Sequence, residues 1–197
     1  MARPREFDEA EALDRAMDVF WKKGYQATST DDLMQAMGIR RGSFYNAFRS
    51  KRDVYLRTLD RYLELLRDGG PYRALFEMEP GADALRTLTR NYLASVASDE
   101  GAHGCYFVHV AKEHRGQDPE VRAAIGKGIA QMKSILGEHI RAAQEQGVLP
   151  PHLDAERAAL MMMAVAWGSH VLIEAGAPEN EVLDMAGLLF ELSPGPA

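Results

Sequence analysis

The chain has 197 residues, of which 46% are hydrophobic and 26% charged, a composition typical of a globular protein with one or two domains. Its single cysteine excludes an internal disulfide and suits a reducing compartment. The N-terminus lacks the apolar run of a signal peptide, and the most apolar segment, residues 158–173, is shorter than the ~20 residues that a transmembrane helix needs. The sequence therefore predicts a cytoplasmic protein with no membrane partner.

Charge is distributed unevenly along the chain. The formal net charge is -6, but residues 1–52 hold ten basic and eight acidic side chains, whereas residues 53–197 hold 13 basic and 21 acidic ones. Six basic residues lie within residues 40–57, beside one acid, Asp53. This asymmetry indicates that the N-terminal part meets a polyanion, although a short basic run is more often a solvated face.

The first predicted helix starts near residue 7 and ends near Gly24, because glycine can adopt the left-handed conformation that stops a helix. Its apolar residues recur at helical spacing: Phe7, Ala10, Leu13, Met17, Phe20 and Trp21. Ser29, with Asp32 three residues later, is typical of a capping box. This pair predicts a second, short helix that ends at Gly38.

A third short helix is predicted over residues 41–48, with Phe44 and Phe48 buried. Two short helices joined by a glycine-containing turn form a helix-turn-helix. A fourth helix is predicted over residues 51–66. The glycines and prolines of residues 67–81 are expected to break any helix and to mark a boundary.

Helical periodicity continues beyond this boundary, and no strand alternation interrupts it. Helices are predicted near residues 82–98, 104–115, 118–147, 154–176 and 179–192. The expected fold is all-α, with about nine helices in two parts. The first part is a three-helix domain with the helix-turn-helix over residues 1–52, and the second is a helical domain over residues 53–197.

Residues 16–59, AMDVFWKKGYQATSTDDLMQAMGIRRGSFYNAFRSKRDVYLRTL, resemble the N-terminal domain of TetR-family bacterial repressors. The resemblance lies in an ordered set: an aromatic pair, KGY, Thr-Ser-Thr, DDL followed by AMGI, a small residue before Phe44 and Tyr45, then Phe48 and Lys51. Beyond this stretch the chain is similar to the family only in being helical and of comparable length. The resemblance implies a homodimer that binds a double-stranded DNA operator and is released when a small-molecule effector enters the C-terminal domain.

The third helix is the expected recognition helix, since residues near the start of such a helix read bases in the major groove. Arginine suits guanine, asparagine suits adenine, and a glycine allows close approach of the backbone. The predicted base-reading residues are Arg40, Arg41, Gly42, Ser43 and Asn46.

The resemblance also implies contacts to DNA phosphates, which the start of a helix favours on physical grounds. The residues expected to make them are Thr28, Ser29, Tyr45 and Lys51. Tyr45 could instead be a half-buried packing residue. Arg3 and Arg5 could form an arm that reaches the minor groove, or could simply be disordered.

Residues 158–173 are apolar on almost every side, so this helix has to be covered all round. Packing between two subunits would cover it, and so would the centre of a monomeric bundle. With the following helix, the segment predicts a dimer interface that includes Met162, Val165, Leu188 and Leu189.

Residues 103–114, HGCYFVHVAKEH, contain the single cysteine. In a helix, Cys105, His109 and Glu113 would share one face. Three interpretations stay open: a buried structural thiol, a reactive sensor thiol, or a metal ligand for which no clean fourth ligand exists. The predicted pocket for an apolar or aromatic effector includes Tyr92, Cys105, Phe107, His109, Met132, Met163 and Trp167.

The leading hypothesis is a ligand-responsive repressor without a metal or cofactor. Its alternative is a regulator of the same fold that is released by oxidation or alkylation of Cys105. An enzyme using Cys105 and His109 is the competing class, but no motif supplies an orienting acid and the basic helix would have no role. A non-specific architectural or protein-binding helical module is the third class. The sequence therefore predicts that the protein is not an enzyme.

Overall fold

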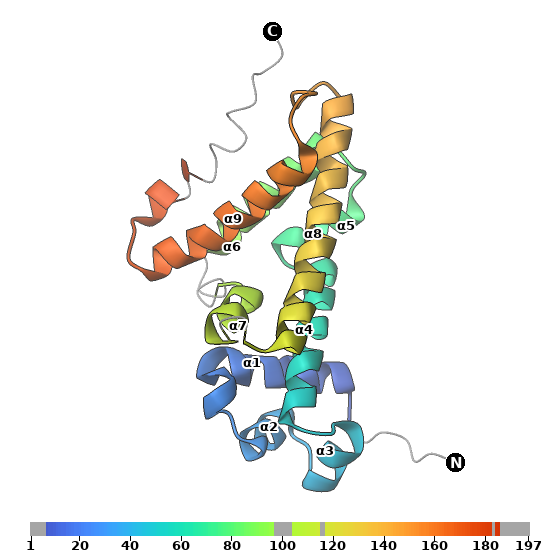
Figure 1. The fold of residues 1–197 in the computed structure, drawn as a ribbon, viewed down its shortest axis with the longest axis vertical. Coiled ribbons are helices and arrows are strands. Elements are labelled where there is room, and N and C mark those ends of the chain that lie inside the picture. Colours follow the sequence, from blue (N-terminus) through green and yellow to red (C-terminus); the bar gives the residue numbers. More distant parts are fainter. Residues whose placement is uncertain (1–6, 97–103, 115–116, 183, 186–197) are drawn as a thin grey trace, which may run out of the picture. The chain divides into compact units, whose positions relative to one another are not determined.

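The computed structural model describes residues 7–96, 104–114, 117–182 and 184–185 (Figure 1). Within these ranges the ordered elements are all helices, which confirms the predicted all-α fold. None of the described helices has the length and apolar character needed to span a membrane. The helices are α1 (Glu9–Ala27), α2 (Thr30–Met37), α3 (Arg41–Ala47), α4 (Lys51–Asp68), η1 (Pro71–Arg73), α5 (Ala74–Glu77), α6 (Ala82–Val96), α7 (Tyr106–His114), α8 (Pro119–Glu145) and α9 (Ala155–Glu174).

The chain divides into two compact units, and the division falls within α4 and α8. Unit 1 consists of Met1–Glu64 and Tyr106–Ile125, and unit 2 of Leu65–Cys105 and Gly126–Ala197. Unit 1 therefore joins the helix-turn-helix, which ends at Ala47, to α7, which begins at Tyr106, and to the start of α8. The sequence predicted a division of the chain by role, with DNA binding in residues 1–52 and effector binding and dimerisation in residues 53–197. That division of roles stays a prediction.

Helix α1 begins at a side-chain cap and is interrupted by a glycine. Asp8 accepts hydrogen bonds from the backbone N–H groups of Ala10 (2.8 Å) and Glu11 (3.1 Å). The helix extends to Ala27, three residues beyond its predicted end, but Gly24 has non-helical angles of φ 77° and ψ 164°. A positive φ of this kind suits glycine, so the predicted interruption is found inside the helix.

Helices α2 and α3 form the predicted helix-turn-helix. The capping box is confirmed: the Ser29 hydroxyl accepts from the Asp32 N–H (3.0 Å), and the Asp32 carboxylate accepts from the Ser29 N–H (2.8 Å). Gly38 ends α2 in the left-handed conformation, with φ 68°. Phe44 and Phe48 are buried, as predicted, and anchor α3 to unit 1.

The core of unit 1 is aromatic, and α7 supplies part of it. The Tyr55 ring packs edge-on against Phe20, with centroids 4.8 Å apart, and its hydroxyl lies 3.0 Å from Nε2 of His114. The buried Tyr106 hydroxyl lies 3.0 Å from the hydroxyl of Thr58. Burial raises the pKa values of both tyrosines above the ordinary range, so both phenols stay neutral.

The prediction that residues 67–81 contain no helix is wrong for Pro71–Glu77, which form η1 and α5. Pro71 stands at the first position of η1, where its missing N–H breaks no hydrogen bond. Ala74 and Leu75 are buried, so packing favours the helical turn that the surrounding glycines disfavour.

The core of unit 2 is formed by α5, α6, α8 and α9. Its buried members are Leu75, Ala82, Leu85, Leu88, Met132, Leu136, Ile140, Ala143, Ala158, Ala159 and Met163. His139 is buried beside them, with Nε2 3.0 Å from the Leu75 carbonyl oxygen and Nδ1 accepting from the Gly81 N–H. One ring nitrogen thus accepts and the other donates, which fixes the tautomer of a neutral ring.

Candidate nucleic-acid interface

The start of α3 presents polar side chains on its outer side. Arg40, Arg41, Gly42 and Asn46 are exposed, and Ser43 is half-buried. A Cβ atom on Gly42 would meet nothing within 4 Å, so the backbone there is open to an approaching molecule. The structure thus brings the five predicted base-reading residues onto one short segment. Their contacts with bases stay a prediction.

Tyr45 lies on the exposed side of the same helix. Its side chain is 48% exposed, and its ring stands edge-on to Phe44 at 5.2 Å. The Arg41 guanidinium lies 5.7 Å from the centre of the ring. The phenol is therefore accessible, and a cation–π contact holds it beside Arg41.

The arginines around α3 differ from those of α4 in their partners. Among the described residues, no carboxylate forms an ion pair with the side chain of Arg40, Arg41 or Arg49. The α4 arginines are all paired: Arg52 with Asp118 and Glu120, Arg57 with Glu9 and Asp53, Arg61 with Asp14 and Glu64, and Arg67 with Asp68. The unneutralised charge of the basic stretch is therefore concentrated around α3.

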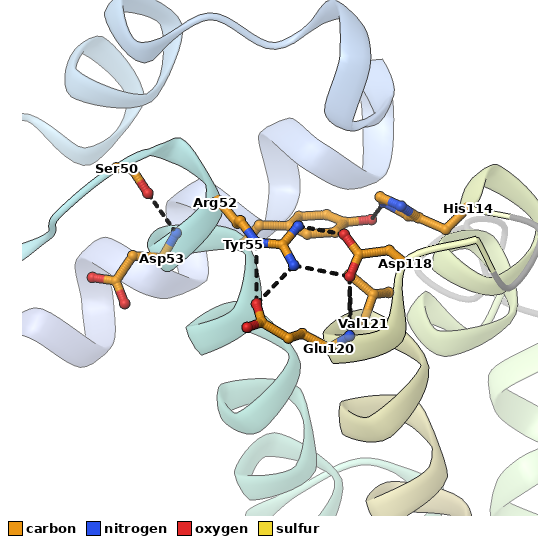
Figure 2. A network of polar contacts seen from close by, with 8 residues as sticks. All are labelled: Ser50, Arg52, Asp53, Tyr55, His114, Asp118, Glu120 and Val121. Carbon is orange, nitrogen blue, oxygen red and sulfur yellow. Dashed lines mark hydrogen bonds and ion pairs between the residues drawn. The ribbon is translucent and has the colours of Figure 1, made fainter.

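The Arg52 contacts tie α4 to the start of α8 (Figure 2). Both terminal nitrogens of Arg52 bind the Asp118 carboxylate, and Nη2 also lies 2.7 Å from Glu120. Asp118 at the same time accepts from the Glu120 and Val121 N–H groups and caps α8. The Arg52 guanidinium holds the pKa of the Asp118 carboxyl well below its usual range.

Thr28 and Ser29 occupy different environments at the start of α2. Thr28 is buried, and its hydroxyl donates to the Gly24 carbonyl oxygen at 2.7 Å. Ser29 is exposed. Ser29 is thus the more accessible of the two predicted phosphate contacts.

Lys51 is tied to the connection between α1 and α2. Its ammonium donates to the carbonyl oxygens of Tyr25 and Thr28, each at 2.8 Å, and lies 4.3 Å from the centre of the Tyr25 ring. A lysine has three N–H groups, so at most one remains for a phosphate. Sequence reasoning gave Lys51 only the phosphate role and missed this structural one.

The predicted helical face of Cys105, His109 and Glu113 is wrong at Cys105, because α7 begins one residue later, at Tyr106. Gly104, with φ 69°, precedes it and breaks helical geometry. Glu113 instead accepts from the backbone N–H groups of Tyr25 and Gln26. Over the described ranges, no three His, Cys, Asp or Glu side chains are grouped to hold a metal ion.

The predicted effector residues fall into both units. Phe107 and His109 belong to unit 1, and the remaining five to unit 2: Tyr92, Cys105, Met132, Met163 and Trp167. Of these, Met132 and Met163 are buried in the core, and Trp167 packs against it.

The Tyr92 surroundings contain a residue that the sequence did not single out. The Tyr92 hydroxyl donates to the Ala166 carbonyl oxygen, and its ring lies 5.5 Å from His170. Burial lowers the pKa of His170, so the imidazole is neutral near neutral pH. His170 was missed because no ligand spacing marks it in the sequence.

Helix α9 carries an exposed apolar face. The predicted interface residues Met162 and Val165 are only half-buried. More exposed apolar side chains lie on the same helix: Leu160 (52%), Met161 (48%), Val171 (38%) and Leu172 (41%). Because the whole segment is apolar, its sequence did not show which side is exposed. The predicted Leu188, Leu189, Arg3 and Arg5 lie outside the described residues.

Two family models match the chain. Residues 12–58 match the model described as "Bacterial regulatory proteins, tetR family", and residues 81–181 match "Tetracyclin repressor-like, C-terminal domain". The repressor ComR of Escherichia coli (strain K12) is 26% identical over 98% of this chain and 91% of its own length. The uncharacterized HTH-type regulator YezE of Bacillus subtilis (strain 168) is 33% identical over 76% of each chain.

Solved structures of other proteins have a similar fold. The TetR family transcriptional regulator CifR, as a cysteine mutant complexed with 26bp double-strand operator DNA, is 31% identical with a TM-score of 0.77. That match covers 98% of this chain and 100% of CifR. A TetR family regulator from Cytophaga hutchinsonii has a TM-score of 0.81 at 18% identity, with coverage of 98% and 100%, and shows the fold alone.

Proposed function

Because the chain belongs to the tetR family of bacterial regulatory proteins, we propose that it is a cytoplasmic repressor that binds a palindromic operator as a homodimer and leaves it when a small-molecule effector binds. The matched proteins are transcriptional regulators, which confirms that this DNA-binding protein is a regulator and not an enzyme. The palindromic operator, the dimer, the effector, the release and the cytoplasmic location are the proposed parts.

The observation that carries the proposal is the exposed start of α3. Arg40 and Arg41 are exposed and form no ion pair with a described carboxylate, so their donors are available to guanine edges. Asn46 would read adenine, and Gly42 and Ser43 would allow close approach. That CifR was solved with operator DNA supports this use of the helix.

Phosphate contacts would flank the reading residues. Tyr45 offers an exposed hydroxyl, Ser29 lies exposed at the start of α2, and Lys51 keeps at most one N–H for DNA. The Thr28 hydroxyl is buried, and its backbone N–H already donates to the Tyr25 carbonyl oxygen at 3.3 Å, so Thr28 would reach a phosphate only by sharing that N–H. These contacts position the protein without reading sequence.

Dimerisation would cover the exposed face of α9. Leu160, Met161, Val171 and Leu172 leave apolar surface in water along a helix with no charge between residues 158 and 173. A second copy of the same face would bury it around a two-fold axis. Met162 and Val165, with Leu188 and Leu189, would extend the interface.

The effector would be apolar or aromatic, since the predicted pocket residues of unit 2 are apolar apart from the Cys105 thiol, the Tyr92 hydroxyl and the Trp167 indole N–H. Tyr92 and the neighbouring His170 are both held neutral by burial, an environment that disfavours a charged ligand.

A second candidate mechanism replaces the ligand with a chemical modification of Cys105. The half-buried Cys105 thiol follows Gly104 and directly precedes α7 of unit 1, so a group added to it would disturb the start of that helix. Release by a thiol-reactive compound in wild type but not in Cys105→Ser would favour this mechanism over reversible binding.

Selection of duplexes from a random-sequence pool tests the proposed function. Wild-type protein should enrich a palindrome and occupy it with two protomers. Leu172→Glu should produce monomers with weak operator affinity, whereas the matched variant Gln131→Glu, exposed on α8, should stay dimeric. Enrichment of no sequence, or a dimer unaffected by charge on α9, would contradict the proposal.

A further inference from the structure

The connection between α1 and α2 is held from two sides within unit 1. This connection, residues 24–28, consists of the end of α1 from its break at Gly24 and of Thr28, and it leads directly to Ser29, the cap of α2. Two charged side chains bind its backbone. One is Glu113 of α7, and the other is Lys51 at the start of α4.

Glu113 binds the N–H side of the connection. One carboxylate oxygen, Oε2, accepts from the Tyr25 N–H at 2.9 Å, and the other, Oε1, accepts from the Gln26 N–H at 3.2 Å. Both oxygens are therefore used, each by a different peptide group. A carboxylate can accept at both positions, whereas an amide of the same size can accept at only one.

Lys51 binds the carbonyl side of the same connection. Its ammonium donates to the Tyr25 and Thr28 carbonyl oxygens. Tyr25 thus donates its N–H to an anion and offers its carbonyl to a cation. Charged partners make the stronger hydrogen bonds in proteins, so this short segment is held firmly in one conformation.

Gly24 leaves room for the carboxylate. A Cβ atom at this position would lie 3.0 Å from Oε1 of Glu113, and the φ of 77° disfavours any other residue. The glycine and the glutamate therefore fit each other, although 88 residues separate Tyr25 from Glu113.

Glu113 lies in the range matched by the C-terminal family model, residues 81–181, whereas the connection lies in the range matched by the N-terminal one, residues 12–58. We propose that Glu113 is a positioning residue for DNA binding. By fixing residues 24–28, it sets the placement of α2 and of the phosphate-contacting Ser29. The inference rests on the proposed function, and it makes DNA affinity depend on a side chain of α7.

The test compares Glu113→Gln with Glu138→Gln, which removes the same charge from an exposed position on α8. Affinity for a labelled duplex of random sequence is measured by fluorescence anisotropy over a salt series. Glu113→Gln should bind roughly three- to tenfold more weakly at every salt concentration. Loss of a negative charge alone would strengthen binding to DNA, so a weakened affinity is specific to positioning.

Two further measurements separate positioning from general loss of structure. The active fraction of Glu113→Gln should match that of Glu138→Gln, and its melting temperature, although lowered by the lost hydrogen bond, should stay well above the assay temperature. Hydrogen exchange at the Tyr25 and Gln26 amides should quicken. Gly24→Ala disturbs the same contact from the other side. Its loss of affinity should therefore be smaller in the Glu113→Gln background than in wild type, because both changes act on one contact.

If Glu113→Gln and Glu138→Gln bind the random duplex with equal affinity, Glu113 does not position the DNA-binding helices. The same conclusion follows if the effects of Gly24→Ala and Glu113→Gln on affinity simply add. Wild-type protein that binds random duplex but selects no palindrome contradicts the repressor proposal and leaves this comparison intact. Wild-type protein that binds no duplex contradicts both.

Discussion

The arginines around α3 and those of α4 stand close together in sequence but have different partners. Arg40 and Arg41 are exposed without a described carboxylate in ion-pairing range, whereas Arg52, Arg57 and Arg61 are each held by two acids. A basic stretch in sequence is therefore not a basic surface in the fold. Its available charge depends on acids that the fold brings from elsewhere.

The origin of those acids explains the difference. Glu9 and Asp14 come from α1, and Asp118 and Glu120 come from the start of α8. All four neutralise α4, and none reaches α3. The helix-turn-helix thus presents its cations on one short helix, which limits the attraction to DNA to the face that would read it.

The largest expected effect compares one arginine from each group. Arg41→Met should weaken operator binding by ~1–3 kcal/mol and reduce the ratio of operator to random-duplex affinity, because a bidentate base contact is lost. Arg57→Met removes the same charge from α4 and should leave that ratio unchanged. Anisotropy titrations with both duplexes measure the ratio.

Equal losses on operator and random duplex for Arg41→Met would assign Arg41 to a phosphate. A changed ratio for Arg57→Met would remove the distinction between the two groups. Arg57 also packs 5.2 Å from the centre of the Phe48 ring, so its replacement should lower the free energy of unfolding by about 1 kcal/mol.

The next effect concerns how much the ion pair between Arg52 of α4 and Asp118 adds to the stability of the protein. Asp118→Ala removes both the cap of α8 and the pair with Arg52, and should lower the free energy of unfolding by ~1–2 kcal/mol. Asp118→Asn keeps a capping side chain and should cost less than about 1 kcal/mol, since Arg52 is 41% exposed. Urea unfolding measures both values.

Asp154 provides the matched control. It caps α9 in the same way, accepting from the Glu156 and Arg157 N–H groups, but among the described residues it forms an ion pair only with Arg157, at 3.9 Å. Asp154→Asn should therefore be nearly neutral. If it costs as much as Asp118→Asn, the Arg52 pair adds nothing to the cap.

The smallest effect is the pH dependence of the same pair. The pKa of Asp118 lies well below its usual range in the folded state because of Arg52, so the pair contributes stability above the unfolded pKa of about 4. That contribution is lost only as the pH falls through the folded pKa. The difference in unfolding free energy between wild type and Asp118→Asn should stay constant from pH 8 to about pH 4 and narrow below it. A difference that already narrows between pH 7 and pH 5 would contradict the lowered pKa.

The sequence predicted what local rules determine. The capping box at Ser29, the left-handed stop at Gly38 and the buried Phe44 and Phe48 follow from neighbouring residues. The residues at the start of α3 were predicted together to read bases for the same reason, because their position in a helix-turn-helix follows from the local sequence.

What the sequence did not predict depends on tertiary contacts. The turn at Pro71–Glu77 forms because Ala74 and Leu75 are buried, which outweighs the glycines around it. Glu113 was singled out for its spacing from Cys105, yet its partners are backbone N–H groups that no sequence pattern marks. The exposed side of α9 was equally hidden, since all sides of that helix are apolar.

Asp118 has two tasks, and this has a consequence for how such sequences diverge. A change that spares the cap, such as asparagine, still leaves Arg52 with Glu120 as its one remaining ion-pair partner among the described residues. Substitutions at positions 52 and 118 should therefore appear together among related proteins. Arg40 and Arg41 form no ion pair with a described carboxylate, so their evolution should track the operator instead.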